Sequence, residues 1–479
     1  MKRIICVLLA LLMIFTLVGC GKKKRQIIKL TLSTEDSEAI LAAAGIRLPD
    51  AADTAASGST IKWFAWYDGF HNYAEDEIVN TGFFTFTEKY GCEIEWLECT
   101  WDKRFDDLAN LILGGTPPDF YPGNSETFPN YAIKGMFAPV DDYVDYDDPL
   151  WNAMKGFADT YFNLGGKHYM ICTDSSFGNV CAYNRRVMDE WGYDDPAELY
   201  FNDEWTWDIF YEMCVDFSDP DEDRYALDSW AYSEAIMDSS GATVVNLDTE
   251  SGKFVSNLDD PRLERAANLL YDLTKNECCY PKWKNGHKLR NDVNGGGIKE
   301  GLCLFWLSPS FVFTGPLDEM SAIWGDIEGG ELMFVPLPRD NNGDGTYYIA
   351  TSPSGYCIVQ GAENPEGVAL FAACERFKII DPTVVSIDRK QLEETYKWSD
   401  EMLAMWDICY ELCNNSEVAI IKYGEGYGSK LYSSINALEN LAHRDISETI
   451  TWAQGKEKHG DSLSYYIDEL NKDILEFSK

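Results

Sequence analysis

Short apolar runs alternate with amphipathic stretches near the start of the chain, and this order limits the possible folds more than any other feature. The β-prone run IKWFAWYDGF begins at Ile61 and ends in an Asp-Gly turn, and residues 92–99 form a second expected strand. Residues 81–91 and 102–115 have helical spacing and end in glycine, which is typical of a helix C-terminus. A third run, DFYP at residues 119–122, completes the order strand, helix, strand, helix, strand, which predicts an α/β sheet.

A polar loop follows directly after this third expected strand. The preceding helix stops at Gly114-Gly115 and cannot restart through Pro117-Pro118, and the strand gives way at once to Asn124, Ser125 and Glu126. Ligands of α/β sheets bind beyond the carboxyl ends of the strands. We therefore expect this loop to form one wall of a ligand site.

The N-terminus reads as an export signal. Lys2 and Arg3 precede an apolar run at residues 4–18, which is shorter than the roughly 20 residues of a membrane-spanning helix. The run ends in LVGC, which resembles a bacterial lipobox and predicts a signal peptide at 1–19 with a lipid on Cys20. An uncleaved anchor and an ordinary signal peptide are the alternatives. Residues 20–60, poor in aromatics, are expected to be a flexible spacer.

Composition narrows the classes of partner. The 479 residues include 80 acidic and 40 basic side chains, for a net charge of −40, which argues against nucleic acid and anionic membrane surfaces as partners. The length allows two or three domains with packed cores. Fourteen cysteines are scattered without a zinc-type CxxC pair, so we expect mainly buried free thiols.

Catalytic signatures are missing from the sequence. It has no GxSxG, HExxH, P-loop or GxGxxG after a strand, and its five histidines are scattered, so we expect neither an enzyme nor a cofactor. A calcium loop is suggested by Asp340, Asn342, Asp344 and Gly345, but Thr351 stands where the bidentate acid belongs. A hairpin turn between two strands is the favoured interpretation, and no metal site is predicted.

Aromatic residues are the positive signal for a ligand. The chain has 15 Trp, 27 Tyr and 24 Phe, most of which must serve core packing. Those beside turns can instead stack on the apolar faces of sugar rings while polar side chains bind the hydroxyl groups. The candidates are Trp66, Tyr67, Trp101, Trp230, Trp306 and Phe311.

Four segments, taken in order, resemble the carbohydrate-binding extracellular solute-binding proteins (family 1) of bacterial ABC importers. The segments are LILGGTPPDFYPGNSETFPNYAIKGMFAPVDDYV from Leu111, GGKHYMICTDSSFGNVCAYNRRVMDEWGY from Gly165, EWTWDIF from Glu204, and IKEGLCLFWLSPSF with PLPRDNNGDG from Ile298. The sequence departs from the family pattern at CTDSSF and at ELYFNDEWTW, and its last hundred residues match only as a helical pattern.

The resemblance implies an α/β fold of two lobes, as in type II periplasmic binding proteins, joined by crossing hinge segments. The first lobe would hold residues 61–167 and about 347–400, and the second would hold 168–346 and about 401–479. The family's cleft residues carry over to Asp68, Trp101, Asn124 and Glu126 on the first lobe, and to Tyr183, Trp230, Ser308 and Phe311 on the second.

The function implied is that of a monomeric, lipid-anchored receptor on the extracellular face of the bacterial membrane. It would bind a carbohydrate, most simply an oligosaccharide, and deliver it to ABC permease subunits and their ATPase. Two alternatives stay open. The ligand could be a peptide or a cationic metabolite, since acids such as Glu126 and Asp68 suit a positive charge, or the protein could be a surface glycoside hydrolase. A purely structural surface lipoprotein is a remaining possibility.

Overall fold

The computed structural model describes residues 35–70, 81–248, 251–282, 297–415, 417–442 and 449–477. The expected signal peptide and the expected lipidation site, Cys20, lie outside these residues. No helix within the described part of the chain is long and apolar enough to cross a membrane.

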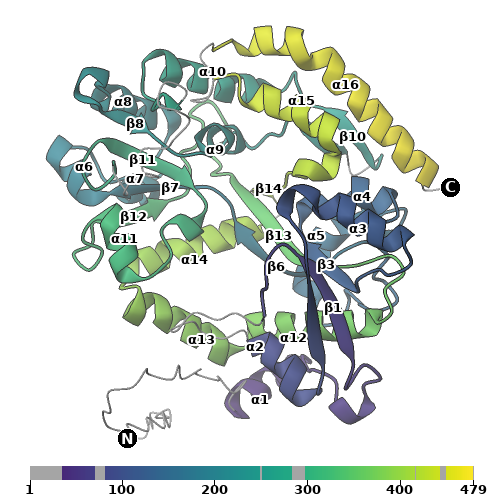
Figure 1. Ribbon diagram of the computed structural model, residues 1–479. Helices are drawn as coiled ribbons and strands as arrows, with labels where there is room; N and C mark the ends of the chain where they lie inside the picture. Colours follow the sequence, from purple (N-terminus) through teal and green to yellow (C-terminus); the bar gives the residue numbers. More distant parts are fainter. Residues whose placement is uncertain are drawn as a thin grey trace, which may run out of the picture.

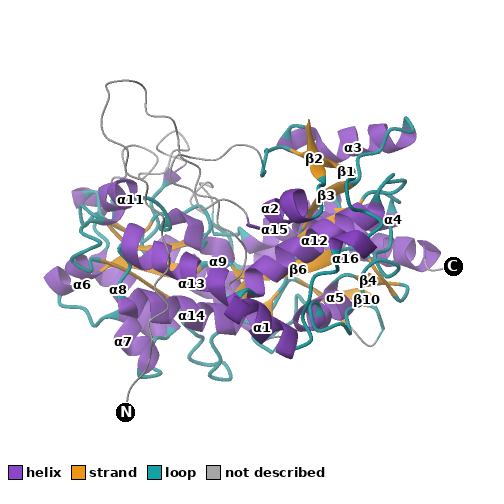
Figure 2. Cartoon of the chain, turned by 90° about the horizontal axis from the view of Figure 1, so that it is seen from below, coloured by secondary structure: helices purple, strands orange, loops and turns teal. Residues whose placement is uncertain are grey.

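Two separate β-sheets, each covered by helices, give the molecule two lobes (Figures 1 and 2). The six-stranded sheet of the first lobe has the order β14-β13-β3-β1-β2, and β6 also pairs with β13. Its strands are β1 (Thr60–Ala65), β2 (Glu93–Glu98), β3 (Phe120–Gly123), β6 (Ile171–Phe177), β13 (Ile349–Ile358) and β14 (Ala419–Ile420). The second sheet has the order β12-β7-β11-β8 and consists of β7 (Val180–Asn184), β8 (Tyr225–Leu227), β11 (Cys303–Ser308) and β12 (Leu332–Val335). Two small ribbons pair β4 (Asn163–Leu164) with β5 (Lys167–His168) and β9 (Val245–Asp248) with β10 (Lys253–Ser256).

The strand–helix alternation predicted for the first lobe is confirmed. Strand β1 pairs in parallel with β2 on one side and with β3 on the other, so the carboxyl ends of all three meet at one edge of the sheet. The helices of this lobe are α1 (Glu35–Ala43), α2 (Thr81–Phe84), α3 (Arg104–Leu113), α4 (Asn130–Ile133), α5 (Lys155–Tyr161), α12 (Pro365–Ile380) and α13 (Pro382–Lys390).

Helices also cover the second sheet, and capping residues define several of their starts. Asn184 accepts a hydrogen bond from the Val187 amide at the start of α6, which ends at Gly192 with a φ of 73°. Asp260 caps α10, whose first residue is Pro261. The helices are α6 (Arg185–Trp191), α7 (Pro196–Phe201), α8 (Trp207–Phe217), α9 (Tyr232–Asp238), α10 (Pro261–Lys275) and α11 (Leu317–Trp324).

The C-terminal segment contacts both lobes. Helix α14 (Asp400–Asn414) packs on β6 and β13 of the first sheet and on β12 of the second. Helices α15 (Ser429–Glu439) and α16 (Trp452–Phe477) pack on each other, and α16 contacts α4 in the first lobe as well as α10 and β10 (Figure 1). The sequence assigns about 401–479 to the second lobe, whereas β14 pairs with β13 in the first sheet.

The chain crosses between the sheets at places that the sequence located only in part. The crossing expected near residue 168 lies at Gly178–Asn179, because β6 still belongs to the first sheet and β7 is the first strand of the second. The prediction of a hairpin turn at Asp340–Gly345 is wrong. Strands β12 and β13 lie in different sheets, so the segment between them is a second crossing.

The expected flexible spacer is wrong for residues 35–60. This part of the chain contains helix α1, and it buries Leu41 and Ala56. The Tyr90 hydroxyl donates to the Pro49 carbonyl at 2.7 Å, and the Cys92 thiol donates to the Ala56 carbonyl at 3.2 Å. A few apolar residues are enough to dock the segment on the first lobe, although they show no sustained period.

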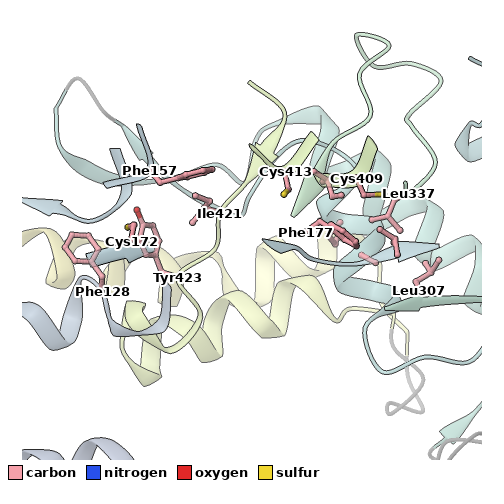
Figure 3. Packing of buried hydrophobic residues seen from close by; sticks show 14 of the residues in the cluster. Phe128, Phe157, Cys172, Phe177, Leu307, Leu337, Cys409, Cys413, Ile421 and Tyr423 are labelled. Atoms are coloured by element: carbon pink, nitrogen blue, oxygen red, sulfur yellow. The ribbon is translucent and has the colours of Figure 1, made fainter. Parts of the chain in front are cut away.

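Buried side chains form one continuous hydrophobic cluster through both lobes. Figure 3 shows part of it, with Phe128, Cys172 and Tyr423 at one end and Phe177 and Leu307 toward the other. All twelve cysteines of the described residues are buried and none forms a disulfide with another described residue, which confirms for them the prediction of core thiols. Burial raises the pKa of these thiols where a shift is resolved, as for Cys99 and Cys278, both to about 11, so they behave as small apolar side chains.

Candidate ligand-binding cleft

A cavity of about 490 Å³ lies where the two sheets and the C-terminal segment meet. The polar loop after β3 lines one side with Ser125 and Glu126, and the first residues of β13 continue that wall. The crossing residues Gly178 and Asn179 line it as well. Trp230, the start of α9 and Pro309 line the opposite side, and residues of α15 close it. The cavity is large enough for a small ligand and is lined from both lobes.

A buried arginine organises the wall from the first lobe. Arg104, at the start of α3, is only 3% exposed, and its Nη2 lies 3.3 Å from Glu126 Oε2 and 2.6 Å from Glu425 Oε2. Its guanidinium lies 3.7 Å from the centre of the Trp101 ring and donates to the Trp101 carbonyl. Burial raises the pKa of Glu126, and Arg104 opposes this shift. The Asn124 side chain accepts a hydrogen bond from the Glu126 amide at 2.9 Å, which fixes the turn.

Two aromatic pairs stand on the two lobes. On the first lobe Trp66 meets Trp101 edge-on, with ring centroids 4.5 Å apart, and Trp101 is 43% exposed. On the second lobe Trp230 stacks on Phe311 with centroids 6.1 Å apart, and these residues are 41% and 66% exposed. Large aromatic rings are seldom left this open without a partner, and Trp230 itself lines the cavity.

Buried polar atoms without hydrogen-bond partners gather around Trp230 and the crossing. Trp306 Nε1 and Ser308 Oγ have none among the described residues, and they lie on the same face of β11, two positions apart. Trp230 stands edge-on to Trp306 at 6.0 Å. Asn179 Oδ1, on the cavity wall, also lacks a partner within the described chain. Unpaired buried donors and acceptors are rare in native proteins, so these atoms call for a partner beyond the described residues.

The far side of the cavity carries a buried charge cluster. Lys422 Nζ, just after β14, lies 3.1 Å from Glu234 Oε1, 2.8 Å from Asp238 Oδ1 and 3.6 Å from Glu439 Oε2. Glu234 and Asp238 stand one turn apart on α9, and Glu439 ends α15. Burial raises the pKa of Asp238 to about 7 and raises that of Glu439.

The sequence profile of the bacterial extracellular solute-binding protein family matches residues 67–374, which is well over half of the chain. The chain belongs to this family. Among curated proteins, none matches the sequence significantly.

Solved structures of similar fold show the same two-lobed architecture at low sequence identity. An ABC substrate-binding protein from Listeria monocytogenes in complex with cycloalternan is 15% identical, with a TM-score of 0.57 over 87% of this chain and 99% of that one. The GacH receptor of Streptomyces glaucescens, studied unliganded and with acarbose, is 13% identical, with a TM-score of 0.58 over 86% and 99%. A sugar transporter protein of Rhizobium etli in an open conformation is 14% identical, with a TM-score of 0.56 over 88% and 98%.

Two of the site residues predicted from the sequence of this solute-binding protein line the cavity, and several others lie beside them. Glu126 and Trp230 line the cavity, Asn124 caps the turn that holds Glu126, and Phe311 packs on Trp230. Ser308 directly precedes the lining residue Pro309. Trp66 and Trp101 adjoin the wall through Arg104 rather than lining the cavity.

Two predicted residues have other surroundings. Asp68 Oδ1 accepts a hydrogen bond from the Phe70 amide at 3.1 Å, within the turn after β1. Tyr183 is fully buried on β7, and its hydroxyl donates to Asp195 at the start of α7. Neither lines the cavity, and the position of Tyr183 is that of a structural residue in the second lobe.

Several lining residues carry no motif that sequence reasoning could have used. They are Asn179, Glu234, Thr351, Ser352, Lys422, Tyr432 and Glu439. Asn179 marks the crossing, which became visible only when β6 and β7 were assigned to different sheets. The others come together through tertiary contacts of the C-terminal segment.

Proposed function

We propose that this solute-binding protein is the receptor of an ABC importer and binds an oligosaccharide in the cavity between its lobes. The observation that carries the proposal is the exposed pair Trp230 and Phe311 beside the unpartnered atoms Trp306 Nε1, Ser308 Oγ and Asn179 Oδ1. A sugar ring has an apolar face that stacks on an aromatic ring, and hydroxyl groups that donate and accept at once. Trp230 and Asn179 both line the cavity, so an aromatic ring and an unpaired polar atom border the same space.

Similar folds hold saccharides in the structures described above, with cycloalternan bound to the Listeria protein and acarbose to the Streptomyces receptor. At these identities the likeness extends to the fold alone. It supports a carbohydrate as the first class of ligand to be tested.

Delivery and anchoring complete the proposal. The lipobox-like LVGC would place the chain on the extracellular face of the membrane through a lipid on Cys20, beside the permease subunits that take the ligand. The protein acts as a monomer and carries out no chemistry on its ligand.

The test is a thermal-shift and calorimetric screen of the protein from residue 35 onward against linear and cyclic oligosaccharides, peptides and polyamines. A ligand that binds only the native state stabilises it by about 2.7 kcal/mol at a hundredfold excess over the dissociation constant, and this stabilisation raises the melting temperature. We expect a shift with one class of oligosaccharide and no released product. A shift with peptides alone would overturn the carbohydrate assignment, and released monosaccharide would indicate a hydrolase.

Replacing Trp230→Ala tests the same proposal at one residue. Loss of the stacking surface is expected to weaken oligosaccharide binding by tenfold or more, equivalent to about 1.4 kcal/mol or above. The matched control is Tyr465→Ala, which removes an aromatic side chain that is 59% exposed on α16 and does not line the cavity. Equal affinity in both variants would contradict the proposed role of Trp230.

A further inference from the structure

Among the described residues around the cavity, acidic side chains outnumber basic ones, and two of these acids, Asp238 and Glu439, are buried. Lys422 is shared by Glu234, Asp238 and Glu439, and Arg104 is shared by Glu126 and Glu425, so five carboxylates face two cations. Asp238 is 1% exposed and Glu439 is 7% exposed. Carboxylates buried this deeply are normally paired one to one, since an uncompensated charge in a low-dielectric site is costly.

The excess charge faces the cavity. Glu234 and Glu439 line it directly, and Lys422 lines it between them. Burial, together with the nearby carboxylates of Glu234, Glu126 and Glu439, raises the pKa of Tyr432, which also lines the cavity. The negative potential therefore extends from the Lys422 cluster toward the loop that holds Glu126.

Two further observations point to a ligand rather than to a self-contained ion cluster. Asn179, 5% exposed, lines the same cavity, and its Oδ1 accepts no hydrogen bond from any described residue. Asp238 Oδ2 likewise has no hydrogen-bond partner in the described chain, while its Oδ1 lies against Lys422. Asn179 Oδ1 and Asp238 Oδ2 are acceptors, so the partner that these two atoms lack is a donor, and the surplus of carboxylates around Lys422 favours a cation as that donor.

We propose that the ligand is a saccharide that carries a free, protonated amino group, and that Glu234 and Glu439 bind this ammonium while the sugar ring stacks on Trp230. The proposal rests on the proposed function and names its substrate class. An ammonium has three N–H donors and one positive charge. The donors can bond to the unpaired acceptor atoms, and the charge offsets the surplus of carboxylates. An N-acetylated or fully hydroxylated sugar would supply donors but leave the charge unbalanced.

The experiment compares matched saccharides at pH 7 by isothermal titration calorimetry on the chain from residue 35 onward. Each amino-sugar monomer and oligomer is paired with its N-acetyl and its hydroxyl counterpart of the same linkage, and spermidine serves as a cation without a sugar ring. We expect every saccharide that binds to bind at least tenfold more tightly in its amino form. The preference should shrink as salt rises, because the ammonium–carboxylate attraction is screened.

The variant Glu234→Gln locates the ammonium. Its side chain is 52% exposed, so the substitution is compatible with the fold. It should weaken binding of the amino form at least tenfold and change binding of the hydroxyl form no more than about twofold. The matched control is Asp259→Asn, which removes a carboxylate that is 99% exposed and away from the cavity, and it should alter neither.

The outcomes separate this inference from the proposed function. If hydroxyl or N-acetyl sugars bind as tightly as amino sugars, the inference is overturned and the carbohydrate receptor stands. If spermidine binds and no saccharide does, the carbohydrate receptor is overturned, and with it the amino-sugar assignment. If Glu234→Gln weakens both forms equally, the carboxylate does not select the amine and the inference fails.

Discussion

Arg104 joins an aromatic wall to two carboxylates that would otherwise be partly buried without a counter-charge. Replacing Arg104→Met keeps the length and apolar body of the side chain but removes the charge from Glu126 and Glu425. We expect the free energy of unfolding in urea to fall by about 1–3 kcal/mol, since a charged hydrogen-bond network loses its donor.

The control for Arg104 is Arg389→Met on α13. Arg389 pairs with Asp407 at 2.6 Å, but both side chains are well exposed to solvent. Exposed pairs contribute roughly 0–1 kcal/mol, so this variant should change stability little. Equal losses in the two variants would show that burial of Arg104 adds nothing to its ion pairs.

Asp238 makes stability depend on pH in an unusual direction. Burial raises its pKa from 3.8 to about 7, so between these values the folded protein holds a proton that the unfolded chain has released. Stability contributed by this group is therefore lost as pH rises through that window. Asp238→Asn removes this pH dependence. The free energy of unfolding of the variant minus that of the parent should therefore rise by roughly 2–3 kcal/mol from pH 5 to pH 8.

Urea unfolding at the two pH values measures this change, and the exposed Asp407→Asn serves as control. A difference between Asp238→Asn and the parent that stays constant with pH would contradict the raised pKa. The variant also loses the contact with Lys422. This loss lowers its free energy of unfolding at both pH values, so it cannot be mistaken for the expected change with pH.

Sequence reasoning reached those site residues that local signals mark. Glu126 follows a strand end, and Trp230 stands in a loop beside turn residues, and both line the cavity. Lys422 and Glu439 could not be found in this way, because their burial depends on α9, β14 and α15 meeting in space. Tyr183 lies on the crossover strand where it was expected, but its hydroxyl donates a hydrogen bond to Asp195 within the second lobe and does not reach the cavity.

At the scale of elements, α16 packs through a glycine. A Cβ added at Gly455 would lie 2.4 Å from a methyl group of Leu441, whereas one added at Gly460 would lie 3.5 Å from Leu258. Gly455→Ala is therefore expected to lower the free energy of unfolding by about 1–3 kcal/mol through overpacking. Gly460→Ala, on the same helix, should be neutral or stabilising by up to about 1 kcal/mol, because alanine is the better helix former.

Thermal or urea unfolding of both variants checks this contrast. Both substitutions gain the same intrinsic helix propensity of alanine over glycine. A difference between their effects on the free energy of unfolding therefore isolates the packing of α16 on the segment that follows α15. Stabilisation by both substitutions would show that Leu441 moves aside without cost.

Helices and strands could be predicted from the sequence where the spacing of apolar residues agreed with the position of helix- and strand-ending residues such as glycine and proline. The alternation from β1 to β3 was correct, since each helix and strand there carries its own pattern and both expected helices end at glycine, Gly91 and Gly114. The supposed hairpin before β13 was wrong, because two strands joined by a turn-like segment can pair with each other or with distant partners, and the local sequence is the same in both cases.

At the scale of the whole molecule, we expect the two lobes, which crossing segments connect, to close on a ligand. The chain passes between the sheets at Gly178–Asn179 and again between β12 and β13. Asn179 lines the cavity itself, so a ligand that filled the cavity would contact both lobes and the crossing at once. Contacts made only in the closed arrangement would shift the population toward it.

Small-angle X-ray scattering with and without saturating oligosaccharide measures this closure. We expect the radius of gyration to fall on binding in the parent, because the lobes approach, and to fall less in Trp230→Ala at the same ligand concentration, because fewer molecules are occupied. Tyr465→Ala should follow the parent, since its ring lies outside the cavity. An unchanged radius in a parent sample shown by calorimetry to be saturated would mean that the ligand enters a cavity already in its bound shape. The C-terminal helices, which contact both lobes, would then hold the lobes in place instead of following their motion.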